Sequence, residues 1–219
     1  GTLFISGQDI GYDLGSGNSF MNNYLAADYS ADDSNSNTVN GQTGTAYSGA
    51  SYDLSGGDGA GNNYYPDEVT LYTSASGSEA VCLKYGTGTN AGIQHDSGTY
   101  KTIYFAFPFE AINSRDDRKD AMERALQYLG YDFPPQVTIT SPEDGSGTSS
   151  TTVTVTWTGS DDNGIDHYEL FLDNSPVDTN IPASQTSYTL SGLSNGMHTV
   201  KVKAVDTADQ VGFDEVDFW

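Results

Sequence analysis

Aspartates in loops are the residues of this sequence with the clearest potential for chemistry. They occur in three groups, interspersed with Asn, Ser and Gly: Asp28, Asp32 and Asp33; Asp161, Asp162 and Asp166; and Asp206 and Asp209. Closely spaced carboxylates repel one another unless a cation or solvent screens them, and loop oxygens are the ligands that calcium prefers. The sequence therefore predicts calcium in at least one group. The alternative is solvated turns, because Asp and Asn favour turn conformations by themselves.

A nucleophile with an adjacent base is harder to find. Cys82 lies in an apolar run, which is typical of a small buried hydrophobe. Ser6 would need a base. We expect His95 in a Gly/Ser-rich turn, and the sequence does not place it beside Ser6. We expect a hydrogen-bonded loop around Ser6 and no catalytic residues. A hydrolase that uses Ser6 or Glu110 is the alternative.

The net charge of the chain and the length of its apolar runs exclude several classes of binding partner. The 219 residues include 30 acidic and 8 basic side chains, for a formal charge of -22. Such a surface repels nucleic acid and anionic lipid, and no apolar run approaches the roughly 18 residues of a membrane span. We expect no nucleic-acid partner, no direct membrane insertion, and an extracellular or cell-surface location. An acidic coat adapted to high salt is another explanation of the charge.

The hydrophobic pattern changes at Phe133-Pro134-Pro135-Gln136, from a helical period to a period of two. We therefore expect two domains, residues 1–133 and 134–219. In the second, apolar residues alternate with polar ones in short runs separated by turn residues, which predicts a β-sandwich. These runs are Val137 and Ile139; Val153, Val155 and Trp157; Tyr168, Leu170 and Leu172; Tyr188 and Leu190; Val200, Val202 and Ala204; Val216 and Phe218.

Particular residues of the second domain extend this interpretation. Trp157 on the second strand, the run Leu193 to His198 before a strand, and Ala204 to Asp209 resemble bacterial and archaeal Ig-like, or fibronectin III-like, repeats. The resemblance implies a spacer or adhesion module. Asp209-Gln210 stands where these repeats commonly have Gly-Asn, which changes that turn.

The first domain contains two apolar runs and one well-marked helix. Thr2 to Ser6 and Tyr100 to Phe107 are apolar on both faces, as in parallel sheets. A helix is expected from Arg115 to Leu129, with Ser114 as N-cap and Gly130 as C-cap. Residues 28–66 are poor in aliphatic side chains, so we expect a long ordered insertion or hairpin at the surface.

The strings LFISGQDIGYDL, FMNNYLAADYSADD, NNYYPDE and IYFAFPFEAI resemble the class I glutamine-amidotransferase-like domain of secreted archaeal and bacterial peptidases and surface proteins. The resemblance implies an incomplete flavodoxin-like α/β domain, truncated at its N-terminus, ahead of the Ig-like sandwich. It also implies a degenerate site, because the turn after Phe4-Ile5 carries no Cys. The missing strands would come from an upstream fragment of the same protein, a neighbouring chain or a refolded arrangement.

These inferences converge on a non-catalytic extracellular structural or interaction module. It would associate by strand pairing with copies of itself or with an upstream fragment, as a building block of a filament or surface layer. The residues expected to pair are Thr2, Leu3, Phe4, Ile5 and Ser6. The alternative is the C-terminal accessory region of a secreted peptidase.

Overall fold

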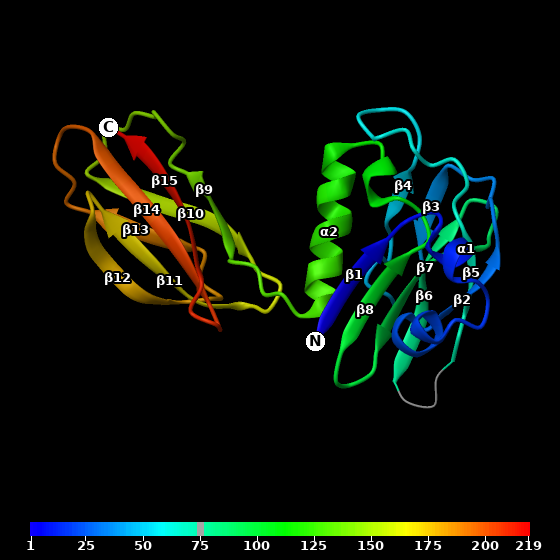
Figure 1. Ribbon diagram of the computed structural model, residues 1–219. Coiled ribbons are helices and arrows are strands. Elements are labelled where there is room, and N and C mark those ends of the chain that lie inside the picture. The colour runs from blue at the N-terminus through cyan, green and yellow to red at the C-terminus, as the bar shows by residue number, and fades with distance from the viewer. Residues whose placement is uncertain (74–76) are drawn as a thin grey trace. The chain divides into compact units, whose positions relative to one another are not determined.

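The chain divides into two compact units, Gly1–Tyr131 and Asp132–Trp219. The computed structural model describes residues 1–73 and 77–219 (Figure 1). The boundary lies two residues before the position expected from the double proline. Each unit has its own hydrophobic core.

The first unit is built on an eight-stranded sheet. Six of its strands are neighbours in the order β1-β8-β7-β6-β3-β4. A side branch is formed by β2 and β5, with β5 also touching β7. The pairing of β1 with β8 is parallel, and the other pairings are antiparallel. The strands are β1 Thr2–Ser6, β2 Ala27–Ala31, β3 Thr38–Gly41, β4 Ser51–Asp53, β5 Glu68–Leu71, β6 Ser78–Tyr85, β7 Asn90–Asp96 and β8 Lys101–Phe105.

Helices cover both faces of this sheet. Side chains alternate along β8, so Ile103 and Phe105 face the cluster that contains Ala121 and Ala125 of α2, whereas Tyr104 faces the cluster around the π-helix η1. The helical elements are α1 Ile10–Leu14, η1 Met21–Leu25, η2 Phe109–Ala111 and α2 Arg115–Leu129.

The bounds and caps expected for α2 are confirmed. The Ser114 hydroxyl accepts a hydrogen bond from the Asp117 N–H at 3.0 Å, which satisfies one of the free donors of the first turn. Gly130 adopts φ +95° and ends the helix, because a left-handed residue at this position favours glycine. The sequence therefore determines α2 locally.

The expected flavodoxin-like α/β fold is wrong. The chain is 44% strand and 14% helical, and β6, β7 and β8 follow one another as antiparallel neighbours. The two apolar runs do pair in parallel with each other, as β1 and β8, but every other pairing in this sheet is antiparallel. Residues 102–105 of β8 are buried, whereas β1 is only partly buried. Strand β1 finds a partner in its own chain, since all five of its residues pair with β8.

Residues 28–66 include a hairpin, as expected, because β3 and β4 pair as antiparallel neighbours, but the segment is not confined to the surface. They supply β3, β4 and most of β2, and their Tyr47, Tyr52 and Leu54 side chains are buried in the core. The Tyr47 hydroxyl donates to the Ala121 carbonyl at 2.9 Å, and the Tyr52 hydroxyl donates to Asp120 at 2.6 Å. Tyrosine thus replaces the aliphatic side chains that this segment lacks, as its rings fill volume and its hydroxyls find partners.

The second unit is a two-sheet β-sandwich. One sheet has the order β13-β10-β9 and the other β12-β11-β14-β15. Trp157 and Tyr168 meet edge to face in the core, with ring centroids 5.5 Å apart. The strands expected from the alternating pattern are confirmed, whereas β12 was missed because its side chains are mostly exposed. The bounds are β9 Gln136–Ser141, β10 Thr152–Ser160, β11 Ile165–Leu172, β12 Ser175–Pro182, β13 Ser187–Ser191, β14 His198–Asp206 and β15 Val211–Phe218.

Candidate functional site

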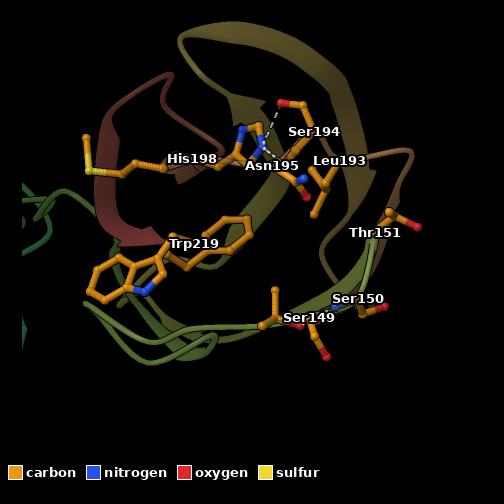
Figure 2. A pocket seen from close by; sticks show the side chains of 12 residues that line it. Ser149, Ser150, Thr151, Leu193, Ser194, Asn195, His198 and Trp219 are labelled. Carbon is orange, nitrogen blue, oxygen red and sulfur yellow. Dashed lines mark hydrogen bonds between the residues drawn. The ribbon is translucent and has the colours of Figure 1, made fainter.

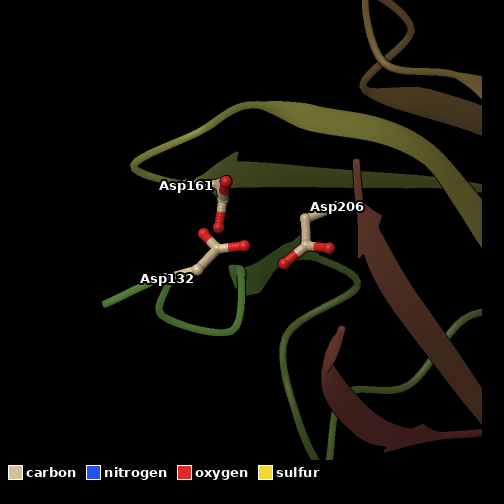
Figure 3. A group of neighbouring side chains, drawn as sticks. All are labelled: Asp132, Asp161 and Asp206. Atoms are coloured by element: carbon tan, nitrogen blue, oxygen red, sulfur yellow. The ribbon is translucent and has the colours of Figure 1, made fainter. Parts of the chain in front are cut away.

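Three aspartates far apart in sequence meet at one end of the second unit. Carboxylate oxygens of Asp132, Asp161 and Asp206 lie within 4.8 Å of one another, and Figure 3 shows the three groups close together. Strand register brings them there: Ser160 pairs with Gln136, and Ile165 pairs with Asp206. The turn between β10 and β11 therefore lies beside both the start of β9 and the end of β14.

Asp206 is the most deeply placed of the three, with 1% of its surface exposed. Its Oδ1 accepts hydrogen bonds from the N–H groups of Ala208 and Gln210, both at 2.8 Å. Its Oδ2 is buried and has no hydrogen-bond partner. One oxygen fixes the turn after β14, and the other is left bare.

Asp161 repeats this arrangement in the preceding turn. Its Oδ2 accepts from the N–H groups of Asn163 at 2.8 Å and Gly164 at 2.7 Å, while its Oδ1 is buried without a partner. The Oδ1 of Asp132 accepts from the side-chain amide of Asn163. The same turn thus orients two of the three carboxylates.

The three carboxylates are not neutralised by a basic side chain. None of the ion pairs between described residues involves them. Two unit charges at this separation repel by about 1 kcal/mol in water and by roughly 3 kcal/mol near a protein surface. When ionised, the group therefore favours a cation.

The other predicted metal ligands lie elsewhere. Their carboxylates belong to no group of three potential ligands among the described residues. Asp28 accepts from Gly17 N–H at 2.7 Å, and Asp33 accepts from Asn35 N–H at 3.0 Å. Asp32, Asp162, Asp166 and Asp209 are exposed.

Two of these exposed residues make side-chain contacts of their own. Asp162 accepts from Phe133 N–H at 3.3 Å, and Asp166 pairs with His167 at 2.8 Å. Asp132 was not among the predicted ligands, because nothing along the chain links it to Asp161 and Asp206. Its position just before the double proline was the only signal.

Ser6 lies at a shallow cavity of about 310 Å³ at the end of β1, whose lining also includes Gln8, Asp9 and Glu110. The Ser6 hydroxyl accepts from Phe109 N–H at 3.4 Å, and Glu110 accepts from the Asn62 amide at 2.7 Å. The lining carboxylates, such as Asp9 and Glu110, could act as bases, but no hydrogen bond between described residues joins the Ser6 hydroxyl to one of them. This arrangement supplies a hydrogen-bonded loop and no activated nucleophile.

The other candidate nucleophile, Cys82, and the candidate base, His95, are inside the first unit. Cys82 is fully buried, and burial raises the pKa of its thiol, which suppresses the reactive thiolate. His95 is on β7, not in a turn, and is 1% exposed. Its Nδ1 lies 3.3 Å from the Tyr24 carbonyl, and its ring packs edge to face on Tyr100. Both side chains have core roles.

Asp67 is a second buried carboxylate, in the first unit. Its Oδ2 accepts from the N–H groups of Gly11 at 2.7 Å and Tyr12 at 3.2 Å, and its Oδ1 has no partner. Burial raises its pKa to about 7, which the two backbone hydrogen bonds oppose and the neighbouring Asp9 and Asp32 reinforce. The group therefore titrates near neutrality.

A hollow of about 470 Å³ lies in the second unit, between the loops 148–151 and 193–198 (Figure 2). His198 in its wall makes a 2.8 Å contact with Asp173, and this hydrogen bond, together with the Ser194 carbonyl, raises the pKa of His198. Phe218 and Trp219 complete the lining. The Ser194 hydroxyl lies 3.3 Å from His198 Nε2 (Figure 2), and His198 Nδ1 contacts Asp173, so a serine, a histidine and an aspartate follow one another in hydrogen-bonding contact here. The same Nε2 lies 3.0 Å from the Ser194 carbonyl, and whenever it carries a proton for that carbonyl it is not free to act as a base toward the hydroxyl.

Among the described residues, no helix combines the length and the apolar character needed to cross a bilayer.

Residues 135–202 match the family profile of the bacterial Ig domain. The second unit is Ig-like. Such domains are typically non-catalytic and are often extracellular or on the cell surface. The match lies within the Ig-like unit, and nothing supports an amidotransferase-like domain in the first. A search of curated proteins gave no match.

Several solved structures show partial similarity to this chain. Fibronectin(III)-like modules of Clostridium thermocellum CbhA are 22% identical, with a TM-score of 0.34, over 38% of this chain and 94% of that one. The Clostridium perfringens spore cortex lytic enzyme SleM is 15% identical, with a TM-score of 0.32, over 43% of this chain and 30% of that one. Three N-terminal domains of the bacteriophage RB49 outer capsid protein Hoc are 14% identical, with a TM-score of 0.31, over 74% of this chain and 54% of that one. These scores are too low to assign a function.

Proposed function

We propose that the chain is a non-catalytic extracellular structural module that joins copies of itself or neighbouring chains by strand pairing, as a building block of a filament or surface layer. The observation that carries this proposal is the outer edge of β1. Strand β1 is the last strand on its side of the eight-stranded sheet, so it has one paired edge and one edge without a strand partner among the described residues.

The backbone groups on that outer edge can be identified from the register. In a parallel pair, alternate residues direct both backbone groups to the same side. The Lys101 N–H donates to the Gly1 carbonyl, and the Gly7 N–H donates to the Phe105 carbonyl. Odd-numbered residues therefore face β8, and the N–H and C=O groups of Thr2, Phe4 and Ser6 face outward.

Side chains keep this edge ordered and leave it accessible. Phe4 packs edge to face on Phe105 and Phe109, with centroids 5.2 and 5.7 Å apart, which anchors the strand in the core. Thr2 and Leu3 are exposed. The strand also lacks the charges and prolines by which proteins commonly block an edge, whereas β12 contains Pro176 and Pro182.

A proline at position 2 tests this proposal directly. Thr2→Pro removes an outward N–H at the first residue of the strand, where proline is tolerated, and leaves the pairing with β8 intact. We expect the wild-type chain to associate with rising concentration in sedimentation velocity experiments. The variant should associate at least tenfold more weakly, because the added strand loses a backbone hydrogen bond and meets the proline ring.

Thr2→Val is the matched control, because it keeps the N–H and the β-branched shape; it should associate like the wild type. Circular dichroism of all three proteins checks that the fold is intact. A wild-type chain that stays monomeric at every soluble concentration, or a Thr2→Pro variant that associates equally well, contradicts the proposal.

A further inference from the structure

We propose that Asp132, Asp161 and Asp206 form a calcium site that fastens the first residues of the Ig-like unit to two of its turns. This inference is separate from the proposed strand pairing, since the three aspartates lie on other elements than β1. It assigns a ligand role to Asp132, which sequence analysis did not single out.

The decisive feature is a buried carboxylate oxygen that accepts no hydrogen bond. Asp206 is 1% exposed, and its Oδ2 has no hydrogen-bond partner, although buried polar atoms are nearly always paired. Asp161 Oδ1 is likewise buried and unpartnered. Figure 3 shows the Asp206 carboxylate beside that of Asp132, with one of its oxygens directed toward it.

The cluster is also ordered before any ion arrives. The second oxygens of Asp161 and Asp206 are each held by two backbone N–H groups at 2.7 to 2.8 Å. Neither side chain can turn away to solvent without breaking both hydrogen bonds. A ligand set that is already positioned loses little entropy on binding.

The distances between the carboxylate oxygens favour calcium over magnesium, although both are hard cations that bind oxygen. Calcium binds oxygen at about 2.3 to 2.6 Å and accepts irregular geometry, so two of its ligands can lie about 5 Å apart. Magnesium requires about 2.1 Å and a regular octahedron, so its ligands lie at most about 4.2 Å apart. Oxygens separated by up to 4.8 Å fit calcium without contraction of the turns.

A bound ion would join three segments that already touch. The Gln210 side chain donates to the Asp132 carbonyl at 3.1 Å, and Phe133 N–H donates to Asp162 at 3.3 Å. These contacts place the entry of the Ig-like unit against the turns after β10 and β14. These two hydrogen bonds leave the charges of the three carboxylates uncompensated. Bound calcium would neutralise those charges and so stabilise this end of the sandwich.

The experiment uses the full chain, calcium chloride as the probe, and tryptophan fluorescence. Both tryptophans, Trp157 and Trp219, lie in the Ig-like unit, so the signal reports its unfolding alone. We expect calcium to raise the Tm by at least about 3 °C over chelator, in a saturable manner. Sodium chloride at matched ionic strength should not reproduce the saturation, and magnesium should act at least tenfold more weakly.

The Asp206→Asn variant tests whether Asp206 binds calcium or only stabilises its turn. The asparagine Oδ1 can still accept from Ala208 and Gln210, so the turn survives, while its amide replaces the bare oxygen and removes one charge. We expect at least tenfold weaker calcium binding by titration calorimetry. In chelator, the variant should be at least as stable as the wild type, because the amide can donate to the other carboxylates.

Asp209→Asn is the matched control, since it removes the same charge from the same turn but lies outside the cluster. It should keep calcium binding within about threefold, and asparagine tolerates the φ of +64° at this position. If Asp206→Asn fails to fold, Asp132→Asn gives the same test. Equal calcium responses in Asp206→Asn and Asp209→Asn, or no saturable binding to the wild type, overturn the proposal.

Discussion

At the scale of single residues, burial gives two aspartates unusual properties. Asp67 and Asp206 are both nearly inaccessible, and each uses one oxygen to accept two backbone hydrogen bonds while the other has no partner. Asp206 has two further carboxylates within 4.8 Å, which makes a cation the natural partner. Asp67 lies under α1 with a pKa near 7, which makes a proton the natural partner.

Asp67→Asn should remove a pH dependence of stability in the first unit. Because the folded pKa is raised from 3.8 to about 7, the native state holds a proton that the unfolded state releases. Stability should therefore fall as pH rises from about 4 to 7 and then level off, with a total loss of about 4 kcal/mol from this group.

The measurement is urea unfolding followed by tyrosine fluorescence between pH 4 and 8. Asparagine cannot ionise, so the variant should be more stable than the wild type at pH 8 and similar to it near pH 4. A variant whose unfolding free energy declines with pH as steeply as that of the wild type would show that Asp67 is not the responsible group.

At the scale of elements, a close approach of two strands depends on a glycine. A Cβ at Gly212 on β15 would lie 1.7 Å from the Pro135 carbonyl oxygen, just before β9. This distance is far below van der Waals contact, so Gly212→Ala must push the strands apart. We expect a loss of about 2 to 4 kcal/mol in the unfolding free energy of the Ig-like unit, from overpacking.

Tryptophan fluorescence during denaturant unfolding checks this expectation. Val211→Ala is the control, because Val211 is the preceding residue on the same strand and is 47% exposed; it should change stability by less than about 0.5 kcal/mol. If Gly212→Ala is as stable as the control, β9 and β15 tolerate separation and the contact is not needed.

At the scale of the whole molecule, the net charge of -22 opposes compactness. The ion pairs between described residues engage only a few of the 30 acids, so repulsion outweighs attraction. Monovalent salt should therefore stabilise both units, raising Tm by roughly 2 to 5 °C between low and physiological ionic strength. Calorimetry in sodium chloride tests this; a Tm that falls with salt would mean that attractive pairs dominate.

The sequence determined those features whose causes are local. Ser114 and Gly130 set the ends of α2 through capping, and period-two alternation marked Val153, Val155 and Trp157 as one strand of the sandwich. Such features depend on residues within a turn or a strand of one another, so a linear pattern contains them.

Only the tertiary structure decided the sheet of the first unit and the aspartate cluster. Apolar runs such as Thr2–Ser6 are compatible with parallel and antiparallel neighbours alike, and the choice depends on which layers cover the sheet. Asp132, Asp161 and Asp206 meet because β9, β10, β11 and β14 pair in one register. Strand register is set by contacts between residues distant in sequence, and therefore no local pattern along the chain encodes it.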